Sequence, residues 1–150
     1  MPYQLIYSSV SSTPMQSEDL QDILKRAQDN NARQGITGAL VYVDGFFLQI
    51  LEGSMESVCR LMEKIAGDIR HETVTVLQAG EVADASFSDW TMAYVSATPE
   101  QIAEWAGLKT PLALPELFEQ VRQDRQRAMQ LAKSIMSVLL GELVQNGKAP

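Results

Sequence analysis

The stretch ITGALVYVDGFFLQILEG, residues 36–53, decides the fold class of this 150-residue chain. Two runs rich in β-branched, aromatic and other apolar residues, 36–43 and 46–51, flank the dipeptide Asp44-Gly45. An Asp-Gly pair between two such runs is a strong signal of a two-residue type I′ turn. The stretch therefore predicts a β-hairpin at the centre of the fold.

A helix is predicted on each side of this hairpin, over residues 17–35 and 54–67. Within each range apolar side chains recur at positions i, i+3, i+4 and i+7, the pattern of one helix face. Serine opens each range as a suitable N-cap, and glycine closes it because glycine readily adopts the left-handed conformation that ends many helices.

Three further strands are predicted, over residues 3–8, 73–78 and 90–95. The resulting order, β-α-β-β-α-β-β, is an α+β arrangement that matches the ferredoxin-like plan with one additional strand. A capped helix is predicted over 98–107, and residues 116–144 form either one long amphipathic helix or two helices end to end. With two helices on one face of the sheet, the other face needs a cover, and we expect these C-terminal helices to pack on it.

The composition excludes several kinds of partner. The formal net charge is −7, so a basic surface for nucleic acid or anionic lipid is not expected. The one cysteine, Cys59, cannot form an internal disulfide, and with the one histidine, His71, it makes a poor metal site. Since no secretory leader and no apolar run of about 18 residues is visible, we expect a cytoplasmic protein that binds no metal, membrane or nucleic acid.

The sequence carries little catalytic machinery. It lacks the Gly-x-Ser-x-Gly elbow and both common loops that bind nucleotide phosphates. Cys59 falls inside a predicted helix, where a small buried thiol is the usual case. We therefore expect the chain not to be an enzyme.

Several polar residues stand on predicted strands where a core favours apolar ones. Gln49 is surrounded by apolar residues whichever face points inward, so its amide is expected to be buried and hydrogen-bonded. Tyr7 lies beside it if the first and third strands pair. On the last strand, Trp90, Met92 and Tyr94 share one face. A purely structural role stays open for all of them, because Tyr and Trp in strands mostly fill a core.

Two polar pairs are equally open. Asn30-Asn31 is typical of a helix end, and Arg70-His71 is typical of a solvated loop. Together with the strand residues, however, these pairs occur in an order that is specific to one protein family.

The chain resembles the BLUF family, the flavin-binding sensors of blue light. The resemblance covers roughly residues 2–97 and no single piece of it would be specific alone. The matching pieces are LIYSS at 5–9, DIL at 22–24, NN at 30–31, GITG at 35–38, FLQILEG at 47–53, D-x-RH at 68–71 and F-x-x-W-x-M at 87–92. The element order predicted above is also the fold of that family.

The resemblance implies a flavin, FAD or alternatively FMN, held without a covalent bond between the two helices. It implies that Ile23 and Ile65 sandwich the ring, that Asn31 bonds its carbonyl edge, and that Gln49 bridges Tyr7 and the flavin. Trp90 and Met92 then compete for a place beside Gln49. The implied cofactor contacts are Tyr7, Ile23, Asn30, Asn31, Gln49, Ile65, Asp68, Arg70 and His71.

The resemblance also implies how the chain works. Residues 1–97 are the photosensor domain, and light rearranges the hydrogen bonds among Tyr7, Gln49 and the flavin. Residues 98–150 form a helical extension for capping, oligomerisation or output, and they are too few for a cyclase or phosphodiesterase. We therefore expect a short, stand-alone photoreceptor, a homo-oligomer that signals to an unidentified partner protein through the last strand and these helices.

Two other functions use the same fold. One is a flavin-free ferredoxin-like adaptor that serves for dimerisation or ligand binding. The other is an enzyme of the acylphosphatase-like type, which needs an arginine in an anion-binding loop and has no motif to support it. Flavin binding separates the leading hypothesis from both.

Overall fold

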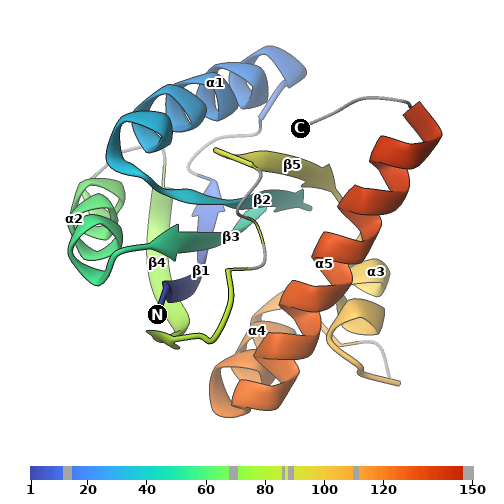
Figure 1. Ribbon diagram of the computed structural model, residues 1–150. Coiled ribbons are helices and arrows are strands. Elements are labelled where there is room, and N and C mark those ends of the chain that lie inside the picture. The colour runs from blue at the N-terminus through green and yellow to red at the C-terminus, as the bar shows by residue number, and fades with distance from the viewer. Residues whose placement is uncertain (12–14, 68–70, 86, 88–89, 110–111, 147–150) are drawn as a thin grey trace.

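A computed structural model describes residues 1–11, 15–67, 71–85, 87, 90–109 and 112–146. Ten helices and strands lie in these ranges (Figure 1). They are β1 (Tyr3–Ser11), α1 (Ser17–Gln34), β2 (Thr37–Val43), β3 (Phe46–Gly53), α2 (Met55–Ala66), β4 (His71–Glu81), β5 (Ala93–Ser96), α3 (Pro99–Trp105), α4 (Leu114–Gln123) and α5 (Arg125–Asn146).

The strands form one five-stranded sheet in the order β4-β1-β3-β2-β5. The first four strands pair antiparallel, and β5 joins the edge parallel to β2. Helices α1 and α2 lie on one face of the sheet, and α3, α4 and α5 lie on the other (Figure 1). The predicted α+β, ferredoxin-like class and the C-terminal helices packed on the sheet are therefore confirmed.

The central hairpin has the predicted turn. Asp44 and Gly45 both have positive φ, 47° and 83°, as a type I′ turn requires. A second glycine of this hairpin, Gly38, lets the two strands approach: a Cβ there would lie 1.9 Å from the carbonyl oxygen of Ile50 on β3. A side chain at position 38 would therefore push β2 away from its partner.

The ends of the first two helices agree with the sequence except at Ser17 and Gly67. Gly67 follows α2 as predicted, but its φ of −91° is not the left-handed conformation that was expected. Helix α1 ends at Gly35 with a φ of 68°, and Ser54 caps α2 by accepting a hydrogen bond from the Ser57 amide at 3.1 Å. The prediction that Ser17 is the N-cap is wrong, because Gln16 occupies that position. The backbone amide of Gln16 donates to Asp19 Oδ2 at 3.0 Å. The aspartate one turn into the helix thus secures the start that Ser17 was expected to secure.

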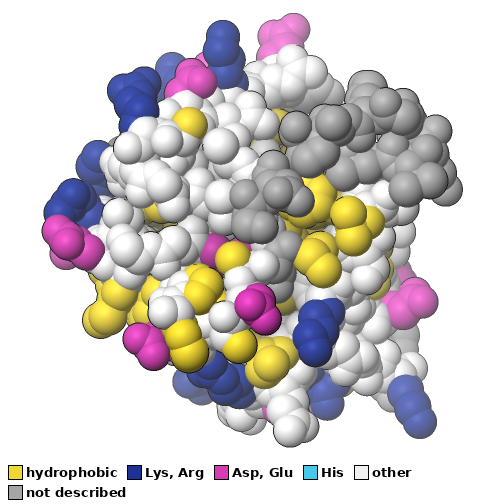
Figure 2. Space-filling model, in the orientation of Figure 1, with side chains coloured by type: hydrophobic (Ala, Val, Ile, Leu, Met, Phe, Trp, Pro, Cys, Tyr) yellow, Lys and Arg dark blue, Asp and Glu magenta, His cyan; other side chains and the backbone are white. Residues whose placement is uncertain are grey.

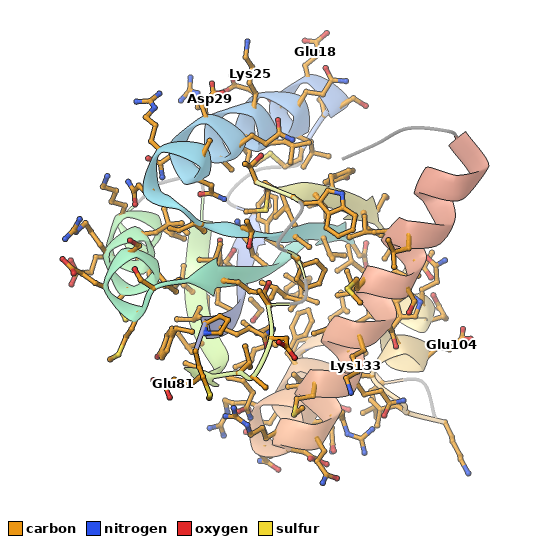
Figure 3. The ribbon with its side chains drawn as sticks, viewed as in Figure 1. Glu18, Lys25, Asp29, Glu81, Glu104 and Lys133 are labelled. Carbon is orange, nitrogen blue, oxygen red and sulfur yellow. The ribbon has the colours of Figure 1, made fainter. Side chains whose placement is uncertain are left out.

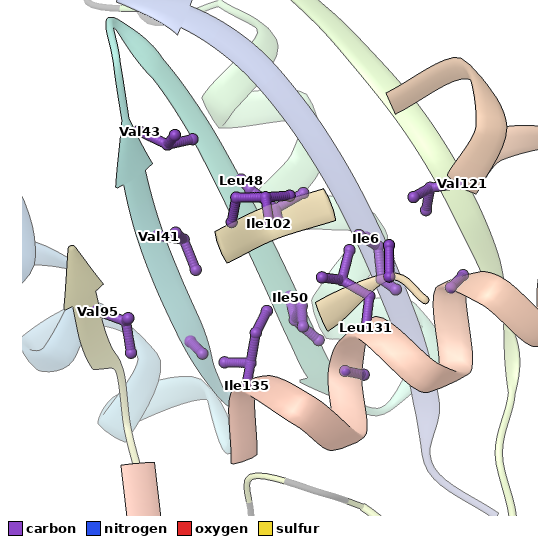
Figure 4. Close-up of a cluster of buried hydrophobic side chains, with 14 of the residues drawn as sticks. Ile6, Val41, Val43, Leu48, Ile50, Val95, Ile102, Val121, Leu131 and Ile135 are labelled. Carbon is purple, nitrogen blue, oxygen red and sulfur yellow. The ribbon is translucent and has the colours of Figure 1, made fainter. Parts of the chain in front are cut away.

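The sheet separates two hydrophobic clusters, because successive side chains of a strand point to opposite faces. On β3, Phe47 and Leu51 belong to the cluster under α1 and α2. Leu48 and Ile50 belong to the larger cluster under the C-terminal helices, where α5 adds Leu131 and Ile135 (Figure 4). The central strand β3 is therefore buried on both faces, and Gln49 is on the α1–α2 side.

The long C-terminal stretch is two helices and not one. Asp124 separates α4 from α5 with extended dihedrals, φ −134° and ψ 104°. Short α3 begins as predicted at a capping box, in which Thr98 accepts from the Gln101 amide at 3.2 Å and the Gln101 side chain accepts from the Thr98 amide. None of the helices in the described ranges is long and apolar enough to cross a membrane.

Most charged side chains lie on the outer surfaces of the elements, and Glu52 on β3 is a buried exception. Glu18, Lys25 and Asp29 point from α1 away from the sheet (Figure 3). Side chains of both signs are spread around the rim of the face seen in Figure 2. This mixture agrees with an acidic chain that presents no basic groove on that face.

The last strand differs from its prediction. Regular pairing with β2 begins only at Ala93, opposite Ala39, so β5 covers 93–96 instead of 90–95. Thr91 and Met92 lie in a bend before it. Because a bend does not alternate as a strand does, Trp90 does not lie on the face predicted for it.

Candidate functional site

Tyr7 and Gln49 form a buried polar pair at the centre of the sheet. Strands β1 and β3 pair so that the two residues lie directly opposite each other. The Tyr7 hydroxyl donates a hydrogen bond to Gln49 Oε1. Tyr7 is 0% exposed and Gln49 is 6% exposed, so this bond is shielded from water. The predicted neighbourhood of the two side chains and the burial of the amide are confirmed.

The other end of the Gln49 amide faces Met92. Its Nε2 donates to the Met92 thioether sulfur over 3.6 Å, and Met92 is itself buried. A thioether is only a weak acceptor. The amide nitrogen therefore keeps donor capacity for a stronger acceptor in its surroundings.

Trp90 lies on the opposite side of the sheet from Met92. It belongs to the cluster under the C-terminal helices and contacts the Phe87 ring, with 6.4 Å between ring centroids. The fully buried carboxylate of Glu52 accepts a hydrogen bond from the Phe87 backbone amide at 2.7 Å. This bond holds Phe87 in place beside Trp90. The prediction that Trp90, Met92 and Tyr94 share a face is confirmed for Met92 and Tyr94 but wrong for Trp90, because the chain bends at residues 91–92. In this structure Met92 is the residue beside Gln49.

Helix α1 holds the bend through two amide side chains. Asn31 Nδ2 donates to the Thr91 carbonyl at 2.7 Å, and Gln28 Nε2 donates to the Met92 carbonyl at 3.0 Å. The two donors are three residues apart and so project from the same face of the helix. The bend is thereby attached to α1 although β5 pairs with β2.

A cavity of about 200 Å³ opens between α1 and α2 above this pair. Ile23 on α1 and Ile65 on α2 line it, and Gln49 lies on the sheet side. Six of the predicted cofactor contacts are brought together here: Tyr7, Ile23, Asn30, Asn31, Gln49 and Ile65. The remaining lining residues are Arg26, Ala27, Leu40, Leu61 and Lys64.

Two cations of this lining were missed from the sequence. Arg26 is largely exposed and pairs with Asp22 at 3.3 Å, and Lys64 is exposed on α2. Their positions contain a usable signal: Arg26 follows Ile23 by three residues and Lys64 precedes Ile65, so both flank an apolar wall. The sequence analysis named neither residue as a candidate.

Three predicted contacts are not located by the structure. Asp68 and Arg70 lie outside the described residues. His71 opens β4, opposite Ser11 in the register, but its side chain is not among those described. Cys59, expected to be buried and structural, is half-buried on α2.

The residues present fit a flavin ring. Apolar walls on two helices suit the faces of a flat ring, and the side-chain amides of Asn31 and Gln49 supply donors and acceptors for its polar edge. The cavity is smaller than the roughly 300–1,000 Å³ of sites that enclose a whole ligand. It therefore suits the ring, while Arg26 and Lys64 offer positive charge for an anionic tail.

Comparison with known proteins decides between a mere cavity and a cofactor site. The family model described as sensors of blue light using FAD, BLUF, matches residues 3–93. This chain belongs to the BLUF family. FAD is accordingly its cofactor, and the flavin-free adaptor is not favoured.

The relatives of this BLUF chain include sensors in larger proteins. Photoactivated adenylate cyclase subunit beta of Euglena gracilis is 37% identical over 110 residues, which cover 73% of this chain and 13% of that protein. The chain thus spans only a small part of the curated relatives that it matches.

Solved BLUF structures share most of the fold. BlsA in its photo-activated state gives a TM-score of 0.72 at 30% identity, covering 91% of this chain and 95% of that chain. The ground state of BlsA gives a TM-score of 0.66 at 36% identity, with coverages of 78% and 83%. The 91% coverage is more than residues 1–97 alone could supply, so the match to the photo-activated state extends into residues 98–150.

Proposed function

We propose that this chain is a blue-light photoreceptor that signals by rearranging the hydrogen bonds among Tyr7, Gln49 and a bound flavin. The observation that carries the proposal is the buried Tyr7–Gln49 pair beside the α1–α2 cavity. In such a buried site the hydrogen bond between the phenol and the amide is stronger than it would be in water, because the local dielectric constant is low.

The proposed binding roles follow from the lining of the cavity. Ile23 and Ile65 hold the two faces of the ring, and the Asn31 amide bonds its carbonyl edge. Asn30 and the predicted group Asp68, Arg70 and His71 contact the ring edge or the ribityl chain near the mouth. Burial of apolar surface on both faces of the ring supplies most of the affinity.

The proposed chemistry needs one property of the cofactor: an excited flavin is a strong oxidant. Tyr7 is the electron donor, and its hydroxyl already donates to Gln49 Oε1, so its proton has a path. The Gln49 amide both accepts and donates, and therefore relays that proton. When electron and proton return to Tyr7, Gln49 is left rotated or tautomerised, and no net reaction has occurred.

The proposed output leaves through the last strand. Met92 contacts Gln49 and is followed at once by β5, which leads into α3 and the cluster under α5. A changed amide therefore has a short mechanical route to the C-terminal helices. We infer that these helices carry the signal to a partner protein, that exposed apolar side chains of α5 such as Met129 and Leu140 serve a homo-oligomer, and that the chain itself turns over no substrate.

The test is spectroscopic. Purified protein incubated with FAD, and separately with FMN, is expected to be yellow and to show a red-shifted flavin band after blue light that reverts in the dark. Gln49→Leu is expected to bind the flavin without this shift. A chain that retains neither flavin is an adaptor; one that retains flavin but shows no reversible shift lacks the proposed photochemistry.

A further inference from the structure

Just before β5, the carbonyls of Thr91 and Met92 are held by side chains of α1. Gly38 on β2 donates its amide to the Trp90 carbonyl at 3.1 Å, and regular pairing with β2 resumes only at Ala93. The two carbonyls in between, of Thr91 and Met92, accept from the α1 amides instead. The position of Met92 therefore depends on α1.

The two α1 amides differ in their relation to the cavity. Asn31 lines the cavity and is 1% exposed, so changing it alters the flavin site as well. Gln28 is half-buried, is not among the lining residues, and donates to the carbonyl of Met92 itself. Gln28 can therefore act on the bend without touching the cofactor.

Met92 has a definite influence on the Gln49 amide. As the amide stands, Nε2 donates to the Met92 sulfur. After rotation Oε1 would face the sulfur, and two acceptors would then oppose each other. A methionine held firmly in this place therefore disfavours the rotated amide and hastens its return.

We propose that Gln28 is a positioning residue that holds Met92 against Gln49 and so limits the lifetime of the light-induced state. The proposal rests on the proposed function, since a lifetime exists only if light rearranges Gln49. The structural part of the proposal, that the position of Met92 depends on Gln28, does not rest on the proposed function.

Gln28→Glu is the decisive variant, because it keeps the size of the side chain and replaces the amide donor by a carboxylate that only accepts. Gln21→Glu is its matched control: it makes the same change of charge at an exposed site of the same helix. Gln28→Leu removes the hydrogen bond without adding charge. Each variant is compared with wild type as the full chain loaded with FAD.

Two readouts are needed. The first is the ¹³C-methyl NMR signal of Met92 in the dark, assigned by its absence in Met92→Leu. The second is the rate at which the red shift decays after illumination. Both Gln28 variants are expected to shift or split the Met92 signal and to slow the decay about three- to tenfold, the effect of one neutral hydrogen bond. Flavin affinity and the behaviour of Gln21→Glu are expected to match wild type.

A double variant separates positioning from general loosening of the site. If Gln28 acts through Met92, then Gln28→Glu adds nothing to the decay rate in a Met92→Leu background. An unchanged Met92 signal with an unchanged decay rate in both Gln28 variants overturns the proposal, and so do fully additive effects in the double variant. If wild type shows no light response at all, the proposed function fails, while the Met92 signal still tests whether Gln28 positions Met92.

Discussion

Replacing Ile135 by alanine tests the docking of α5 on the sheet. Ile135 is 0% exposed and belongs to the cluster that also contains Val41 and Ile50 (Figure 4). The change removes three carbon atoms, which is about 2.4 kcal/mol of transfer free energy at about 0.8 kcal/mol per buried methylene. A cavity adds to this, so we expect a loss of about 3–4 kcal/mol, within the usual range of about 2–5 for such truncations.

The assay is equilibrium unfolding in urea, followed by far-UV circular dichroism and by tryptophan fluorescence. Lys133→Ala is the control, because Lys133 lies on the same helix but is exposed. It should change the free energy of unfolding by no more than about 0.5 kcal/mol. Because one cluster joins the sheet to α3, α4 and α5, both probes should report a single transition in each variant.

Two results would refute this reasoning. Equal, small effects of the two substitutions would mean that α5 does not pack on the sheet in solution. Separate transitions for the two probes would mean that residues 1–97 and 98–150 unfold independently. The domain boundary predicted from the sequence would then separate two folding units.

Three further predictions concern the site and its cover. Gln49→Leu should retain flavin but give no light-induced shift, since leucine can neither donate nor accept; recovery of the wild-type difference spectrum would remove the relay role. Asn31→Ala should weaken flavin retention about 5- to 150-fold by titration, the effect of about 1–3 kcal/mol for an abandoned buried partner, and unchanged affinity would take Asn31 out of the site. Truncation after Val95 should give insoluble or aggregated protein because it uncovers the apolar face of the sheet, and a soluble monomer would contradict the need for a cover.

The hairpin and the Tyr7–Gln49 pair were predictable because local signals define them. Asp44-Gly45 specifies its turn through backbone conformation, and the alternation of β3 fixes the face that Gln49 occupies. The pairing of β1 with β3 then follows from the fold plan. Gln49, a polar residue among apolar neighbours in the sequence, indicated the site, and it is buried as expected.

The segment before β5 was not predictable because distant residues shape it. Trp90 and Met92 are two residues apart and would share a face on a regular strand, yet they lie in opposite clusters. Side chains on α1 and the Glu52 carboxylate bend the chain there, and neither leaves a local signal. The break at Asp124 is similar, since neither proline nor glycine marks it.

The central claim is that the Tyr7 phenol starts the light response, and the light-minus-dark absorption spectrum of Tyr7→Phe tests it most directly. Phenylalanine keeps the ring but removes the hydroxyl that donates to Gln49. Tyr94→Phe is the matched control: Tyr94 packs from β5 against the cluster that contains Tyr7, and burial raises the pKa of its phenol above the ordinary value. We predict that Tyr7→Phe binds flavin and shows no red shift, whereas Tyr94→Phe keeps the wild-type shift; an unchanged red shift in Tyr7→Phe would contradict the account.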